Sequence, residues 1–211
     1  MTYSTCALSD LLDAFASNDP VPGGGSAAAL VGALGVSLLM MVAGLPKTRT
    51  GAPEEAADLS QASARLRPLR EALEQLIDRD AAAYHAVIAA YKLPKISAEE
   101  QANRRQAITD AMRAATETPL DTMRLCQQAL EGAAIVAANG LRSASSDVGV
   151  AIELLLTAAK GAGMNVDVNL EAISDASYTD TIGAERSELE AESIAAAARA
   201  RRSLTSDLRS A

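Results

Sequence analysis

The chain has 211 residues, a formal net charge of −8 and very few aromatic side chains, only Phe15 and four tyrosines. Alanine dominates its hydrophobic share, so the core must be built from closely packed helices rather than from aromatic rings. The negative charge argues against a nucleic-acid binder, which would present a basic face. Cys6 and Cys126 lack metal-ligand spacing, and with no signal peptide we expect reduced thiols in a cytoplasmic protein.

The first predicted element is a short amphipathic helix, indicated by the i, i+3, i+4, i+7 spacing of Leu8, Leu11, Leu12 and Phe15. Two prolines and three glycines within Pro20–Gly25 end this helix. An uncharged run, Ser26–Leu45, follows and predicts a long apolar helix.

The run Ser26–Leu45 is long enough to cross a bilayer, so two readings compete. It is rich in Ala, Gly and Ser, and it lacks the Trp and Tyr anchors of a single membrane span. Its small residues recur at i, i+4 and i+8, which lets another backbone come close. We therefore expect a buried helix and no membrane association.

A polar loop, Lys47–Pro53, separates this helix from a second helical stretch, Glu54–Tyr91. Pro68 should kink or divide that stretch. Ser97 and Glu100 form a capping-box pattern that starts the next helix. Beyond it, we expect helices over residues 97–118, 119–139, 145–161 and 181–210, with residues 164–174 irregular. The whole chain, 1–211, is thus predicted to be one all-α domain, a multi-helix bundle whose Ala-rich faces favour an oligomer.

The glycine turn is the first candidate site. Gly23, Gly24 and Gly25 place bare backbone N–H groups at a helix start, where a ligand can approach closely and where negative charge is favoured. The competing reading is a flexible turn that only caps a core helix.

The second candidate is an acid and a phenol on one face of the Glu54–Tyr91 helix. Asp80 and Tyr84 lie at i and i+4 on an otherwise apolar, alanine-lined face, where a polar partner is expected to meet them. Alternatively, Asp80 pairs with an arginine at an interface. The single histidine, His85, points about 100° away from that face and is expected to be dispensable.

Two further polar groups are candidates near the end of the chain. Asp147 either contributes a carboxylate to a site or serves as an N-cap for the helix that follows. Asn165 and Asn169, four residues apart, can offer both donors and acceptors to a heterocycle, or else form Asx turns in a loop.

Four motifs in order resemble the cyclodeaminase/cyclohydrolase family, which comprises the C-terminal domain of formiminotransferase-cyclodeaminase and stand-alone methenyltetrahydrofolate cyclohydrolases. The resemblance covers nearly the whole chain, although residues 45–51 depart from the Gly-Lys-Lys-Tyr-like run of the stand-alone branch. The four matching stretches are Pro20–Ala29, Asp80–Tyr84 followed by Ala90–Lys95, Ser146–Ala151, and Asn165–Asn169.

The resemblance implies an all-helical homodimer that acts on a tetrahydrofolate derivative, with no metal and no cofactor beyond that substrate. The implied reaction is hydrolysis of 5,10-methenyltetrahydrofolate to 10-formyltetrahydrofolate. Cyclodeamination of 5-formiminotetrahydrofolate and a non-catalytic folate-binding role are the alternatives. The catalytic residues would be Asp80, Asp147 and Tyr84, and the substrate-binding residues would be Pro22, Gly23, Gly24, Gly25, Ser26, Lys47, Asn165 and Asn169.

Overall fold

The computed structural model describes residues 2–205, and its helical architecture confirms the all-α prediction. Within that range the only β-type pairing is an isolated bridge between Thr48 and Gly140. The α-helices are α1 (Leu8–Ala16), α2 (Gly24–Ala43), α3 (Pro53–Tyr91), α4 (Ala98–Asn139), α5 (Ser145–Glu171) and α6 (Ala176–Thr205), with 3-10 turns at Tyr3–Thr5 and Arg142–Ala144.

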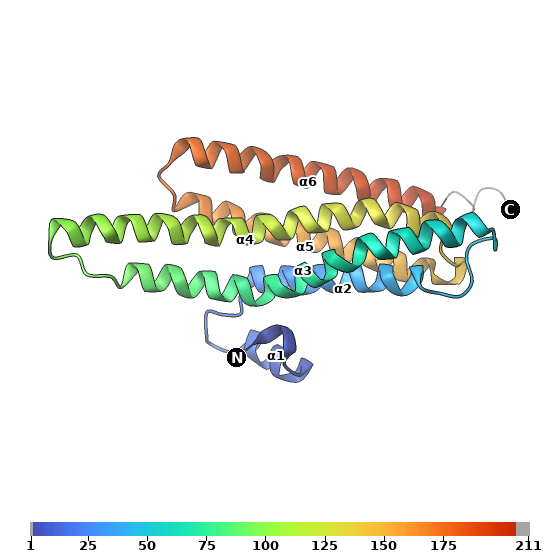
Figure 1. Ribbon diagram of the computed structural model, residues 1–211, viewed down its shortest axis with the longest axis horizontal. Coiled ribbons are helices and arrows are strands. Elements are labelled where there is room, and N and C mark those ends of the chain that lie inside the picture. The colour runs from blue at the N-terminus through green and yellow to red at the C-terminus, as the bar shows by residue number, and fades with distance from the viewer. Residues whose placement is uncertain (1, 206–211) are drawn as a thin grey trace.

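Helices α2 to α6 lie side by side along one long axis, and α1 stands apart on the side away from α6 (Figure 1). Helix α2 packs against α3 and α5, while α4 lies against α3, α5 and α6. The start of the chain is tied to α3, because the carboxylate of Asp78 accepts from the Tyr3 N–H at 2.6 Å and from the Ser4 hydroxyl at 2.5 Å. The Tyr3 hydroxyl in turn donates to the Val21 carbonyl at 3.3 Å, which ties the segment between α1 and α2 to the same anchor.

Small residues let the helices of the core approach closely, as the alanine content predicts. A Cβ added to Gly32 of α2 would lie 3.0 Å from the Cys126 sulfur of α4 and 3.2 Å from a methyl of Leu73 in α3. Complete burial raises the pKa of the Cys126 thiol to about 12. This cysteine therefore packs as a small apolar side chain and stays protonated.

Helix α2 matches the predicted apolar helix, beginning two residues earlier than expected, but only one of its faces is buried. Ten of its twenty residues are buried, whereas Leu34 is 51% exposed and Met41 43% exposed. By length and composition alone α2 is also apolar enough to cross a membrane. The expectation that Ser26–Leu45 is buried is thus met on one face within this chain.

Neither internal proline divides its helix. Helix α3 runs unbroken through Pro68, and α4 runs unbroken through Pro119, so the prediction of separate helices meeting at Pro119 is wrong. A proline removes one backbone hydrogen bond, but tertiary packing along a long helix can outweigh that local loss. The Ser97–Glu100 capping box at the start of α4 is confirmed.

Helix α5 is longer than predicted and begins differently. It continues to Glu171, so most of the segment expected to be irregular, residues 164–174, is helical, and Val166 within that segment is fully buried. Its N-cap is Ala144, and Asp147 lies in its first turn without capping it. Helix α6 begins at Ala176 rather than at residue 181, and the predicted residues 206–210 lie outside the described range.

Candidate functional site

A cavity of about 380 Å³ opens where the start of α2 meets α3, α4 and the end of α5. It brings together candidates that are far apart in the sequence. Of the predicted residues, its lining includes Gly23, Gly24, Gly25, Asp80, Tyr84, Asn165 and Asn169. The glycine turn, the acidic face of α3 and the amide pair therefore belong to one site.

Asp80 reaches from α3 to the first turn of α2. Its Oδ2 accepts the backbone N–H of Ser26 at 2.8 Å and lies 2.9 Å from the Ser26 hydroxyl. It thus takes the place of the N-cap side chain that Gly23 lacks. Its other oxygen, Oδ1, accepts no hydrogen bond from any group within residues 2–205, on a residue that lines the cavity.

Burial raises the pKa of the Asp80 carboxyl, and the two hydrogen bonds from Ser26 only partly oppose that effect. Removing a carboxylate from water disfavours its charged form, whereas donors aimed at it favour the charge. The net direction is upward, so Asp80 holds a proton more tightly than an ordinary aspartate. A carboxyl at a cavity whose pKa is raised by burial is a candidate for proton transfer.

Glycine is required at position 25 because of Asp80. A Cβ there would overlap with the carboxylate, whose Cγ lies 2.6 Å from the ideal Cβ position. Gly24 is packed less tightly, with the Asn165 amide nitrogen 3.3 Å from its ideal Cβ position. The N–H groups of Gly24 and Gly25 find no acceptor among the described residues, so the cavity also contains backbone donors.

The side-chain amide nitrogens of Asn165 and Asn169 each donate a hydrogen bond to a backbone carbonyl. Asn165 Nδ2 donates to Gly161 O at 2.8 Å within α5, and Asn169 Nδ2 donates to Ala115 O of α4 at the same distance. Each amide therefore keeps its oxygen and a second N–H available. Both residues lie within α5, so the alternative of Asx turns in a loop is wrong.

Tyr84 lies one turn after Asp80 on α3 and lines the same cavity, with 38% of its surface exposed. Its hydroxyl makes no hydrogen bond within the described part of the chain. His85 is exposed and meets Tyr84 edge to face, at 6.1 Å between ring centroids, without lining the cavity. The phenol is therefore available to a ligand.

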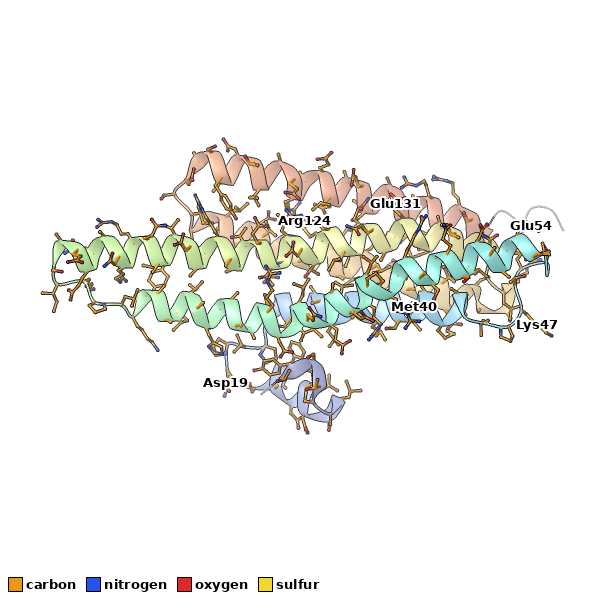
Figure 2. The ribbon with its side chains drawn as sticks, in the orientation of Figure 1. Asp19, Met40, Lys47, Glu54, Arg124 and Glu131 are labelled. Carbon is orange, nitrogen blue, oxygen red and sulfur yellow. The ribbon has the colours of Figure 1, made fainter. Side chains whose placement is uncertain are left out.

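Two predicted site residues lie elsewhere. Helices α2 and α5 run antiparallel, since Gly24 packs near Asn165 and Gly35 near Leu155. Asp147, in the first turn of α5, is 18 residues and hence roughly 27 Å from Asn165. Asp19 precedes the start of α2, where the cavity lies, and Lys47 follows the other end of that helix. Figure 2 shows these two residues far apart. Within one chain, neither side chain reaches the cavity.

The remaining predicted residues, Ser26 and Pro22, are buried beside the cavity and do not line it. Ser26 is fully buried and holds Asp80. Pro22 is buried after a cis Val21–Pro22 bond, and it does not line the cavity. Sequence analysis did not single out the apolar lining. Some of these residues fall inside the four motifs and some do not, and only the packing of four helices shows that they line one cavity. These residues are Val21, Ala83, Val87, Met112, Ala115, Val168 and Ala172, with Pro20 at the turn.

A second cavity, of about 370 Å³, lies between α3 and α4, but its charges are already paired. Asp121 accepts from Arg79 at 2.9 Å and from Arg124 at 2.7 Å. Within residues 2–205 no group of three His, Cys, Asp or Glu side chains is placed to hold a metal ion. The cavity at the start of α2 is thus the stronger candidate, because its polar groups are not paired with one another.

The sequence profile of formiminotransferase-cyclodeaminase matches residues 7–188, which span every residue of this cavity. The chain belongs to that family. It is 38% identical to methenyltetrahydrofolate cyclohydrolase from Methylorubrum extorquens over 169 residues, which cover 80% of this chain and 81% of that protein.

Two other similarities support the same membership. Formimidoyltransferase-cyclodeaminase from Rattus norvegicus is 36% identical over 158 residues, which cover 73% of this chain but only 28% of that longer protein. The crystal structure of formiminotetrahydrofolate cyclodeaminase from Thermotoga maritima superposes with a TM-score of 0.85 at 25% identity, over 97% of this chain and 98% of that one. The family resemblance inferred from the four sequence motifs is confirmed.

Proposed function

We propose that this family member is an enzyme that hydrolyses 5,10-methenyltetrahydrofolate to 10-formyltetrahydrofolate. One structural observation carries the proposal: Asp80 anchors one carboxylate oxygen on α2, and the other has no partner among residues 2–205, on a residue that lines the cavity. The high coverage of the cyclohydrolase relative, in both directions, supports the same reaction.

The chemistry needs few groups. The substrate is an amidinium cation whose bridging carbon already attracts water, so the proposed reaction requires no metal and no cofactor beyond the folate itself. The free Asp80 oxygen would stabilise the cation and accept a proton as water adds to the carbon. Collapse of the adduct breaks the carbon–N5 bond and returns a proton to N5. The formyl group stays on N10, and one proton is released overall.

The surroundings of Asp80 suit this proton movement. The Ser26 hydroxyl lies 2.9 Å from both Asp80 Oδ2 and the Ile77 carbonyl, but it carries a single hydrogen. When Asp80 Oδ1 has taken the proton, Oδ2 still accepts the Ser26 N–H, and the Ser26 hydroxyl can donate to the Ile77 carbonyl. Without that proton, the hydroxyl turns toward Asp80. Both protonation states therefore have a satisfied hydrogen-bond arrangement, and Tyr84 is the proposed group for orienting the water.

The absorbance of methenyltetrahydrofolate tests the proposal directly. At slightly acidic pH, where spontaneous hydrolysis is slow, adding the protein should bleach that absorbance at a rate proportional to protein concentration. Binding without bleaching would instead indicate a non-catalytic folate-binding protein, and no interaction would contradict both ideas.

Cyclodeamination is the second candidate, and the close structural similarity to a formiminotetrahydrofolate cyclodeaminase favours it. In that reaction N10 attacks the formimino carbon and ammonia leaves, which creates the same amidinium cation. Supplying 5-formiminotetrahydrofolate and measuring ammonia release separates the two activities.

We also propose that the protein is a homodimer. Large apolar side chains are exposed on both helices of the α2–α5 pair: Leu34 (51%) and Met41 (43%) on α2, and Val150 (51%) and Met164 (65%) on α5. Exposed apolar side chains gathered on long helices are typical of protein-binding surfaces. Light scattering should give twice the chain mass, and Leu34→Glu should shift the protein toward the monomer.

A further inference from the structure

Pro119 lies within α4 four residues after Ala115, next to the cavity described above. A proline has no N–H, so the α-helical hydrogen bond from residue 119 to the carbonyl of residue 115 cannot form. That carbonyl instead receives the side-chain amide of Asn169 from α5, at 2.8 Å. The proline and the asparagine are thus complementary parts of one contact between two helices.

This contact fixes the orientation of the Asn169 amide. A carbonyl oxygen only accepts, so the NH2 end of the amide must face Ala115. The amide oxygen and the second N–H then remain without a partner in the described chain, on a residue that lines the cavity. If residue 119 carried an N–H, that group would share the same carbonyl. A carbonyl oxygen can accept two hydrogen bonds, so the contact that orients the Asn169 amide would be weakened.

We propose that Pro119 is a positioning residue: by leaving the Ala115 carbonyl without its helical donor, it recruits Asn169 and presents the amide oxygen to the ligand. The ligand edge that fits is one with an N–H beside an acceptor, as on a reduced pterin. That identification of the ligand rests on the proposed function, whereas the positioning of the amide does not.

The contact itself is tested without any ligand. In the wild-type protein one side-chain amide hydrogen of Asn169 should be protected from solvent exchange, as measured by NMR on labelled protein. Pro119→Ala should reduce that protection, because the new backbone N–H competes for the carbonyl. Pro68→Ala is the matched control, since Pro68 also lies inside a helix, while neither it nor Ala64 lines the cavity. Unchanged protection of Asn169 in Pro119→Ala would overturn the proposal.

The effect on binding is tested with methenyltetrahydrofolate by a double-mutant cycle. Pro119→Ala should raise the Kd or KM roughly tenfold, as expected for one disturbed hydrogen bond, with little change in kcat. The double variant Pro119→Ala/Asn169→Ala should bind no more weakly than Asn169→Ala alone, because Pro119 acts through Asn169. Additive losses would contradict the positioning role. A wild-type protein that binds no folate would contradict the proposed function, while the NMR experiment would still decide the role of Pro119.

Discussion

The two ends of the antiparallel α2–α5 pair use their polar groups in opposite ways. At the far end, Glu55 accepts from the Thr48 hydroxyl at 2.6 Å and from the Thr50 N–H at 2.9 Å, which organises the loop before α3. Arg49 holds the end of α4: its backbone N–H donates to the Asn139 carbonyl at 2.8 Å, and its Nε donates to the carbonyl of the next residue, Gly140, at 3.3 Å. At the cavity end, one oxygen of Asp80 has no partner in the described part of the chain. Polar side chains thus hold the fold together at one end and remain available for a ligand at the other.

The pKa directions of the two carboxyls express the same difference. Hydrogen bonds, above all from Thr48, lower the pKa of Glu55 to about 2. Burial raises the pKa of Asp80 despite its two hydrogen bonds from Ser26. A carboxylate surrounded by donors stabilises the loop that supplies them, whereas a desolvated and partly satisfied carboxylate is the kind that can move a proton.

The largest effect is expected from Asp80→Asn. The substitution keeps the shape of the side chain and removes its charge and its proton-transfer capacity, so turnover should fall by roughly 10²–10⁴. Circular dichroism should show unchanged helix content. Asp110→Asn, on the exposed surface of α4, is the control and should retain full activity. A fully active Asp80→Asn enzyme would refute the assignment of Asp80.

Gly25→Ala should have the next largest effect. The added methyl group overlaps with the Asp80 carboxylate and must displace it. A shift of about 1 Å in a catalytic group lowers the rate by roughly a hundredfold, and we expect a loss of that size in kcat/KM. Gly183→Ala is the matched control, because nothing lies within 4 Å of its added Cβ. That variant should keep its activity and gain about 0.5–1 kcal/mol of stability.

Much of this cavity could be predicted from the sequence. Asp80 and Tyr84 share a helix face by spacing alone, and the glycine turn marks a helix start. The function of Gly25 could not be predicted, since its missing side chain makes room for a carboxylate from another helix. Asp147 was placed with the site because its motif matches the family pattern, and Lys47 was placed there although residues 45–51 depart from that pattern. No local pattern reveals that long helices hold both residues near the opposite end. Pro119 was misread for a related reason, because packing over the length of α4 outweighs one missing hydrogen bond.

Lowering the pH should change the contributions of Glu55 and Asp80 to folding stability in opposite directions. Because the Glu55 pKa is lowered from 4.5 to about 2, its stabilising effect is present above pH 4.5 and is lost as the pH falls toward 2. Because the Asp80 pKa is raised above 3.8, its charged form destabilises the fold at high pH, and that penalty is relieved as the pH falls toward 3.8.

Melting temperatures between pH 7 and pH 3 measure both effects. Relative to wild type, Glu55→Gln should be destabilised at pH 7, and the difference should shrink in acid. The melting temperature of wild type relative to that of Asp80→Asn should instead rise as the pH falls. If both differences moved in the same direction, the contrast between the two ends would be contradicted.

The smallest effect is expected from Asp147→Asn. Asp147 lies five turns along α5 from Asn165, and it makes no hydrogen bond or ion pair within residues 2–205. Removing its charge should therefore leave the activity within about twofold of wild type. The free energy of unfolding should change little, as for an ordinary surface substitution. A hundredfold loss of activity would mean that a second copy of the chain brings its Asp147 to this cavity. In that case, mixing the Asp80→Asn and Asp147→Asn variants should restore about a quarter of wild-type activity, because about half of the reassorted dimers would be mixed and each would contain one intact site. Wild-type activity in Asp147→Asn alone would leave Asp80 as the catalytic carboxylate within a single chain.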